Sequence, residues 1–174
     1  GSGTGTFADG TGTSASFKYP LGITTDGTRL YVADQVNHRI RKIVIATGEV
    51  TTLAGSGTGT FADGTGTSAS FKKPEGITTD GTNLYVGDRD NHKIRKIVIS
   101  TRVVTTLAGS GSQGSADGTG TAASFKEPRG ITTDGTNLYV TDTSNYKIRK
   151  IALRKTETAD VGLTNLDNDL NVTV

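Results

Sequence analysis

The chain repeats itself with a period of 54 residues, and this period limits its fold more than any other feature. Residues 1–54 and 55–108 differ at only ten positions. A third copy begins at Gly109 and follows the pattern through Lys150, after which the repeat decays into TETADVGLTNLDNDLNVTV, whose only charged residues are acidic. Such a period predicts small units that stack and share a core, because one unit cannot bury its apolar face alone.

Each copy reads as four short β-strands. In the second copy, Asp80-Gly81 separates the stretches GITT and NLYV, which predicts a hairpin with a type I′ turn and positive φ at both residues. The segments HKIRKIVI and VVTTLA supply the third and fourth strands. No segment has the 3.6-residue apolar period of a helix. The sequence therefore predicts a four-stranded antiparallel sheet in each copy.

The third strand is apolar on both of its faces. In the first copy Ile40 and Val44 lie on one face, and Ile43 and Ile45 lie on the other. A strand of this kind belongs to a sheet that is packed between two other sheets. Radially stacked four-stranded sheets meet this demand, so the predicted fold class is all-β, built from β-propeller blades.

The most regular part of each copy resembles the NHL repeat, a family of propeller blades. The matching segments are FKYPLGITTDGTRLYVADQVNHRIRKI, FKKPEGITTDGTNLYVGDRDNHKIRKI and FKEPRGITTDGTNLYVTDTSNYKIRKI, about 27 residues of each 54. The third copy departs from the pattern at Tyr146, where the others have His38 and His92. The resemblance implies three blades, half of a six-bladed NHL propeller.

The three copies of the repeat predict how the chain is divided. It comprises an inter-blade connector at 1–20, blade 1 at 21–54, a connector and blade 2 at 55–108, a connector and blade 3 with a degenerate outer strand at 109–162, and a C-terminal tail at 163–174. Because propellers need about four to eight blades, a protein partner, a second copy or a longer parent chain must complete the ring. A start on a connector favours the longer parent chain.

Bulk composition excludes several classes of protein. With 32% apolar and 21% charged residues, the chain is neither a disordered tail nor a membrane protein, and no apolar run approaches the roughly 20 residues of a membrane span. The absence of Cys excludes disulfides and thiolate metal sites. A net charge of +2 is too small to indicate nucleic-acid binding by itself.

Three motifs that could carry chemistry have simpler interpretations, and no cofactor is predicted. GSGSQG at 109–114 fits a dinucleotide-binding pattern but no helix follows it. Each FADGTG loop, and the SADGTG loop of the third copy, supplies one carboxylate: Asp9, Asp63 and Asp117. A single carboxylate makes a poor calcium site, so a role in turns is favoured. Zinc would need three or four convergent ligands, so His38 and His92 are expected to brace a neighbouring turn.

Basic residues gather on the third strand, three per copy and nine of the nineteen in the chain. In the first copy they are Arg39, Arg41 and Lys42. They alternate with isoleucine and no aromatic stacking platform accompanies them. We therefore expect these residues to lie on solvated strand edges, and we do not expect them to bind nucleic acid.

Near-identical copies argue against catalysis, because an enzyme site needs different residues in different roles. The first strand reads GITTDG in every copy and supplies no convergent acid, base or nucleophile. The predicted function is a non-catalytic protein-interaction or scaffold module, extracellular or at a cell surface. The alternatives are a hydrolase or lyase whose catalytic residues lie outside these blades, and an RNA-binding propeller.

Differences between the copies indicate where binding would occur. They concentrate in two connections, one before the first strand and one between the second and third strands, which emerge on the same face of a propeller. The candidate recognition residues on this rim are Tyr19, Gln35, Lys73, Glu75, Arg89, Asp90, Glu127 and Arg129.

Overall fold

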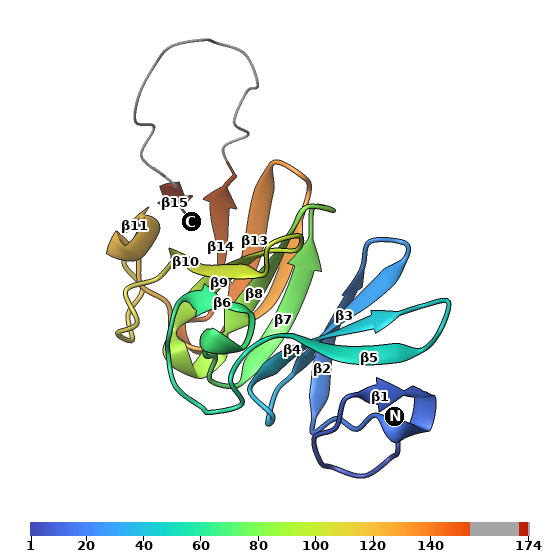
Figure 1. Cartoon of the computed structure of the whole chain (residues 1–174). Coiled ribbons are helices and arrows are strands. Elements are labelled where there is room, and N and C mark those ends of the chain that lie inside the picture. The colour runs from blue at the N-terminus through green and yellow to red at the C-terminus, as the bar shows by residue number, and fades with distance from the viewer. Residues whose placement is uncertain (154–170, 174) are drawn as a thin grey trace.

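The chain forms three antiparallel sheets that fan out from a shared inner edge (Figure 1). The computed structural model describes residues 1–153 and 171–173. Each sheet is one predicted blade, and the inner strands of neighbouring blades contact each other. The all-β prediction of four-stranded antiparallel blades is therefore confirmed.

The strand order is the same in each sheet, with one short strand from the preceding connector added at the outer edge. Blade 1 contains β1 (Gly10–Thr11), β2 (Pro20–Thr25), β3 (Arg29–Asp34), β4 (Arg39–Val44) and β5 (Glu49–Ala54). Blade 2 contains β6 (Gly64–Thr65), β7 (Pro74–Thr79), β8 (Asn83–Asp88), β9 (Lys93–Val98) and β10 (Val103–Ala108). Blade 3 contains β11 (Gly118–Thr119), β12 (Pro128–Thr133), β13 (Asn137–Asp142), β14 (Lys147–Ala152) and β15 (Asn171–Thr173).

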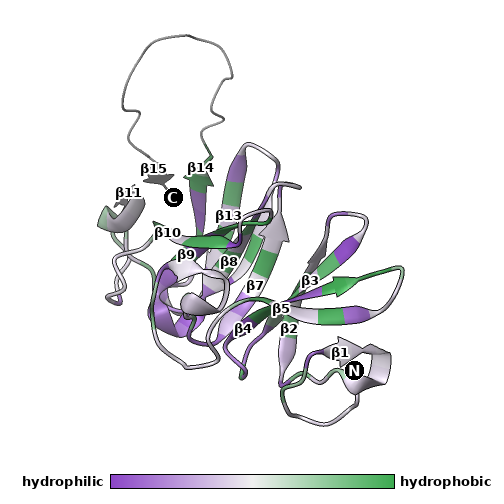
Figure 2. Ribbon diagram, viewed as in Figure 1, coloured by the Kyte–Doolittle hydropathy of each residue, from purple (hydrophilic) through white to green (hydrophobic). Residues whose placement is uncertain are grey.

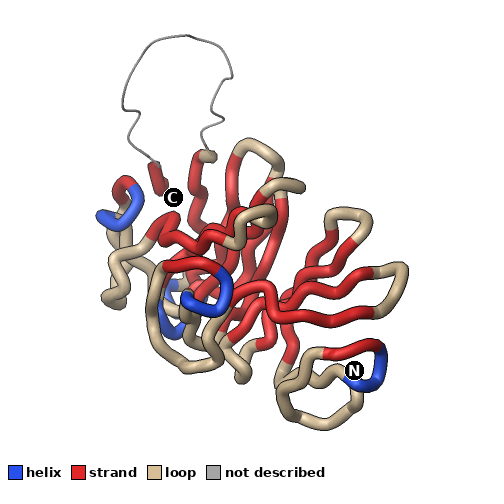
Figure 3. The backbone as a smooth tube through the Cα atoms, in the orientation of Figure 1, coloured by secondary structure: helices blue, strands red, loops and turns tan. Residues whose placement is uncertain are grey.

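Short 3₁₀ helices lie in the connections between strands (Figure 3). Three of them follow the short connector strands: η1 (Gly12–Ser14), η2 (Gly66–Ser68) and η4 (Gly120–Ala122). Two others join the second and third strands of a blade: η3 (Arg89–Asn91) and η5 (Thr143–Asn145).

The outer strand of blade 3 comes from the end of the chain. β15 pairs with β14 through Lys150↔Thr173 and Ile151↔Val172. It falls within the segment that the sequence analysis assigned to a C-terminal tail. The expected degenerate outer strand before residue 162 falls among residues 154–170, outside the described part of the chain.

The hairpin turns form where they were predicted, but they are not type I′. In the hairpin turn of blade 1 Gly27 takes a positive φ, of 89°, while Asp26 does not. The Asp26 carboxylate instead accepts the backbone N–H groups of Thr28 at 2.9 Å and Arg29 at 2.7 Å. Because the side chain closes the turn, Asp26 can keep the ordinary negative φ that an L-residue prefers.

The apolar core lies between the blades rather than within them. One cluster joins blade 1 to blade 2, and a second joins blade 2 to blade 3. The third strands pass through these layers, and apolar segments run along them in Figure 2. Phe71 and Phe125, from the connectors before blades 2 and 3, are fully buried in these layers. Phe17, the counterpart in front of blade 1, is half-buried.

The expectation that the basic residues of the third strand are solvated is wrong for its central arginine and, in blade 2, for Lys93, which is 8% exposed. Arg41, Arg95 and Arg149 are fully buried. In blade 2 the Arg95 guanidinium contacts the carboxylate of Asp88 at 2.7 Å, and neither side chain is exposed. Its second nitrogen contacts the Asp63 carboxylate, also at 2.7 Å. The connector aspartates are therefore partners of a buried cation and not only turn residues.

Four groups surround each of these guanidinium groups, and we call the set the buried arginine cluster. In blade 2 the carbonyl oxygens of Ser70 and Ala62 accept hydrogen bonds from Arg95 at 3.0 and 2.8 Å, beside the carboxylates of Asp88 and Asp63. The same contacts recur around Arg41 and Arg149. The cluster fixes each connector to the blade that follows it, because a buried charge requires these partners.

Candidate functional site

The two variable connections lie side by side on one face of the molecule, which we call the rim. Backbone hydrogen bonds of 3.1 Å join them in every blade: Val36 N–H to Lys18 O, Asp90 N–H to Lys72 O, and Ser144 N–H to Lys126 O. The residue before each proline takes a positive φ: 53° at Tyr19, 51° at Lys73 and 53° at Glu127.

Seven of the eight candidate recognition residues form one connected polar network on the rim. Arg89 lies at its centre, 3.8 Å from the carboxylate of Glu75 and 3.5 Å from that of Glu127. Arg129 reaches the same two carboxylates, at 3.8 and 3.4 Å. The two acids and two arginines therefore alternate, and each arginine is shared between blades 2 and 3.

Further contacts extend this network to blade 1 and to the connector. The Gln35 amide donates to Glu75 at 3.3 Å. Asp90 lies 3.1 Å from the Lys73 ammonium and 3.6 Å from Arg89. The Ser144 hydroxyl donates to Glu127 at 3.0 Å, and this bond is the first cause of the lowered pKa of Glu127. The eighth candidate, Tyr19, lies outside the network and is 69% exposed.

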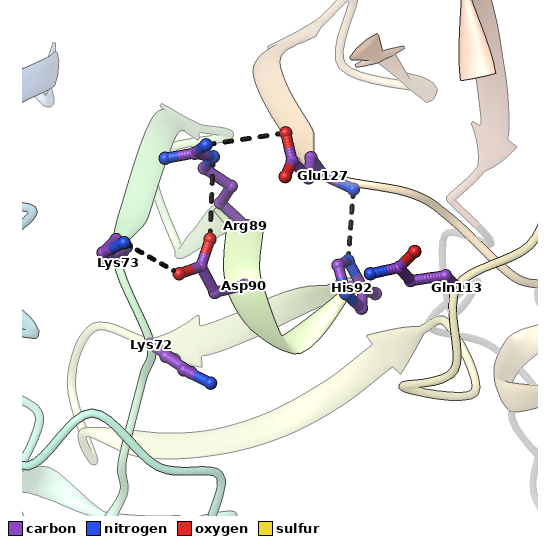
Figure 4. A pocket seen from close by; sticks show the side chains of 7 residues that line it. All are labelled: Lys72, Lys73, Arg89, Asp90, His92, Gln113 and Glu127. Atoms are coloured by element: carbon purple, nitrogen blue, oxygen red, sulfur yellow. Dashed lines mark hydrogen bonds and ion pairs between the residues drawn. The ribbon is translucent and has the colours of Figure 1, made fainter. Parts of the chain in front are cut away.

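A polar pocket of about 300 Å³ opens beside the network (Figure 4). Its lining mixes both signs of charge: Lys72, Lys73, Arg89, Asp90, His92, Gln113 and Glu127. Lys72, His92 and Gln113 were not among the predicted residues, because the prediction was limited to positions that differ between copies in the two connections. The volume is at the lower end of the range for small-molecule sites.

The two histidines brace the next blade, as their positions before the third strand predicted. His38 Nδ1 accepts the backbone N–H of Lys73 at 3.1 Å, and His92 Nδ1 accepts that of Glu127 at 3.2 Å. Burial is the main cause that lowers the pKa of both imidazoles, which keeps them neutral as acceptors. Tyr146, at the equivalent place in blade 3, is 96% exposed.

Residues 109–114 belong to a connector, and the three-residue η4 is the first helix after them. Among residues 1–153 and 171–173, no group of three or more His, Asp or Glu side chains gathers as a metal site would require. Within the same ranges, no helix has the length and apolar character needed to cross a membrane.

Radially arranged antiparallel sheets with a core between them define the class of this protein, a β-propeller module. Comparison with solved structures agrees. A structural genomics protein of unknown function from Bacteroides thetaiotaomicron has a TM-score of 0.66 and 31% identity, over 71% of this chain and 32% of that one. An auxiliary nutrient binding protein from Bacteroides ovatus has a TM-score of 0.64 and 26% identity, over 74% and 36%.

Sequence relatives identify the kind of blade. Human NHL repeat-containing protein 2 is 40% identical over 104 residues, and the chloroplastic protein SUPPRESSOR OF QUENCHING 1 of Arabidopsis thaliana is 36% identical over 162 residues. These matches cover 57% and 85% of this chain. No family model matches it. These relatives confirm the predicted resemblance to the NHL-repeat β-propeller family, and the chain spans 14% and 15% of their length.

Proposed function

We propose that the chain is a non-catalytic binding module, and that the rim network recognises a protein partner carrying charges of both signs. The observation that carries the proposal is the position of the differences between copies. The residues that build each blade are repeated, whereas the residues that differ at the rim converge into one network of alternating acids and arginines.

The exposure of the network suits recognition. The side chains of Arg89 and Glu75 are 21% and 18% exposed, and Arg129 is 39% exposed. Such groups are held in place by one another yet remain accessible to a partner. Complementary charges at an interface favour the correct partner and accelerate its encounter. The likeness to the Bacteroides ovatus auxiliary nutrient binding protein supports a binding role in general.

The buried arginine clusters are not proposed as catalytic sites. Each guanidinium is enclosed by two carboxylates and two carbonyl oxygens and has a structural role. An extracellular or cell-surface location stays a prediction from the sequence.

The test is selection of a displayed random peptide library on the purified chain, followed by affinity measurements with variants. Glu75→Gln/Arg89→Gln/Arg129→Gln removes two positive charges and one negative charge from the rim. Lys42→Gln/Glu49→Gln/Lys150→Gln removes the same charges elsewhere and is the matched control. We expect selected peptides to bind the rim variant about tenfold more weakly, from two or three charged contacts, and the control unchanged. Selected peptides that bind the rim variant as well as the native chain would refute the proposal.

A further inference from the structure

The polar pocket lies at the junction of blades 2 and 3, and most of its lining departs from the repeat. Among the seven lining positions, only Lys72 and His92 keep the residue type found one repeat earlier. The equivalent positions at the junction of blades 1 and 2 are Lys18, Tyr19, Gln35, Val36, His38, Gly59 and Lys73. The junction of blades 2 and 3 therefore has a lining of its own on a shared backbone plan.

The two carboxylates of the pocket already have cationic partners. Asp90 lies 3.1 Å from the Lys73 ammonium and 3.6 Å from Arg89. Glu127 lies 3.5 Å from Arg89 and 3.4 Å from Arg129. Three cations and two carboxylates line the pocket, so one positive charge is in excess when the imidazole is neutral.

Lys72 carries this excess charge. Its backbone N–H donates to Asp88 at 2.8 Å, which holds the residue at the edge of the pocket. Its ammonium has no hydrogen bond or ion pair to another described residue, and no dashed line reaches it in Figure 4. Burial is the main cause that lowers the pKa of His92, and the nearby Lys72 ammonium contributes. The cation therefore lies near the imidazole and is open to a ligand.

The backbone determines which nitrogen of His92 is a donor. Nδ1 accepts the Glu127 N–H at 3.2 Å, so the neutral imidazole carries its proton on Nε2. In the other junction, Nε2 of the equivalent His38 lies so close to Gly59 that a side chain there would clash with it. By the same geometry, Nε2 of His92 faces the part of the third connector that contains Gln113 and lines the pocket.

Gln113 adds an amide beside this nitrogen. The first two copies have glycine at this position, Gly5 and Gly59. The Gln113 side chain lies beside the His92 ring in Figure 4 and has no hydrogen bond to another described residue. An ammonium, an imidazole N–H and an amide NH₂ thus line one pocket, and each has a hydrogen to donate. A few converging donors of this kind are typical of a site for one anionic group.

We infer that this pocket binds one carboxylate group of the partner through the Lys72 ammonium, the His92 Nε2–H and the Gln113 amide. This inference rests on the function proposed for the rim and names the chemical group that enters the pocket. One carboxylate neutralises the single excess charge of the lining. The second charge of a phosphate would instead be repelled by Asp90 and Glu127.

The carboxylate can come from an acidic side chain or from the C-terminus of a peptide, and the pocket of about 300 Å³ has room for either. Binding is followed by NMR of the ring nitrogens in the ¹⁵N-labelled full chain. Because the chain has two histidines, His38 is an internal control for His92. The first probe is acetyl-Gly-Gly-Glu-Gly-Gly-amide, whose side chain is its one charge. We expect it to shift the Nε2 signal of His92 and to leave that of His38 unchanged.

Two related peptides identify the source of the carboxylate. Glutamine in place of glutamate removes the charge, and this peptide should shift neither signal. The glutamine peptide with a free C-terminus carries only a terminal carboxylate. A His92 shift from either carboxylate peptide supports the inference and shows which carboxylate the pocket accepts. No shift from either, an equal shift from the uncharged peptide, or tighter binding of inorganic phosphate overturns it.

Two variants assign the binding to the pocket. Lys72→Gln should weaken binding of the carboxylate peptide about fivefold, as expected for one accessible ion pair. Lys18→Gln is the matched control, because it removes the equivalent ammonium at the other junction, and it should bind as the native chain does. Gln113→Gly restores the residue of the first two copies and should weaken binding about threefold, the effect of one neutral hydrogen bond. Equal affinity of Lys72→Gln and Lys18→Gln contradicts the assignment.

Failure of the peptide-library selection and failure of the pocket give different results. If no library peptide depends on the rim but a carboxylate peptide still shifts His92, protein recognition by the rim is refuted and the carboxylate pocket stands. If library peptides depend on the rim but no carboxylate peptide shifts His92, recognition by the rim stands and the carboxylate pocket is overturned.

Discussion

Replacing Arg95 by methionine tests the claim that the buried arginine cluster fixes each connector to its blade. Arg95→Met keeps much of the side-chain volume and removes the charge. The carboxylate of Asp88 then stays fully buried, and only the Lys72 N–H at 2.8 Å and the Asn91 amide at 2.9 Å remain to solvate it. Breaking a buried ion pair in this way costs about 3–5 kcal/mol.

The lost hydrogen bonds add to this cost. The carbonyl oxygens of Ser70 and Ala62 lose their donor, at about 1 kcal/mol each where no water replaces it. We expect the free energy of unfolding to fall by about 4 kcal/mol, a large part of the about 5–15 kcal/mol of an ordinary domain. With a urea m-value of about 2 kcal/mol/M, the unfolding midpoint moves by about 2 M.

The assay is urea unfolding followed by circular dichroism or tyrosine fluorescence, because the chain has no tryptophan. Asp63→Asn is the control. Its side chain is 45% exposed, and removing an exposed partner costs about 0–1 kcal/mol. Asp88→Asn/Arg95→Met removes both buried charges, and it should recover part of the stability lost in Arg95→Met.

The deficit of Arg95→Met should also depend on pH. Burial raises the pKa of Asp88, and the guanidinium of Arg95 opposes this rise. Without Arg95 the folded chain binds the Asp88 proton more tightly than the unfolded chain, so the variant loses stability as pH rises. Its deficit is therefore smaller at pH 5 than at pH 8. A loss no larger than that of Asp63→Asn, with no such slope, would refute the role assigned to the cluster.

Two further predictions concern the blade interfaces. Burial lowers the pKa of His38 and His92, so the unfolded chain binds their protons more readily and stability is lost as pH falls below about 6.5. Urea unfolding midpoints measured over this pH range should show the loss. The double variant His38→Asn/His92→Asn keeps a hydrogen-bond acceptor at each position and should make the midpoint less dependent on pH. Gly76→Ala places a methyl group against the backbone of Arg129 and should lower the free energy of unfolding by about 1–3 kcal/mol. This loss should exceed that of Gly130→Ala, whose methyl group meets only the Thr141 side chain, and equal losses in urea unfolding would contradict the packing described.

Much of the fold could be predicted from the sequence because the same strand and turn signals recur in every copy. The Asp-Gly pairs located the hairpins, and the doubly apolar third strand required sheets on both sides. The turn type was wrong because the closing acceptor is the Asp26 side chain, which a dipeptide rule based on backbone φ does not consider.

The buried arginines were missed because arginine alternating with isoleucine looks like an exposed strand edge. The counter-ion of Arg41 in the connector, Asp9, is 32 residues away along the chain. A signal did exist: arginine and both of its aspartates are the same in all three copies, although the loops around them vary. The rim network could be located through the differences between copies, but its pairing depends on contacts between blades that no single copy contains.

The buried arginine clusters have a consequence for how the chain can vary. Every cluster takes its cation and both carboxylates from one 54-residue unit: Arg41 with Asp9 and Asp34, Arg95 with Asp63 and Asp88, and Arg149 with Asp117 and Asp142. Gain or loss of a whole unit, joined between 54 and 55 or between 108 and 109, leaves no buried charge without its counter-ion. Unequal recombination between such similar copies can thus change the number of blades in one step and still yield a chain that folds.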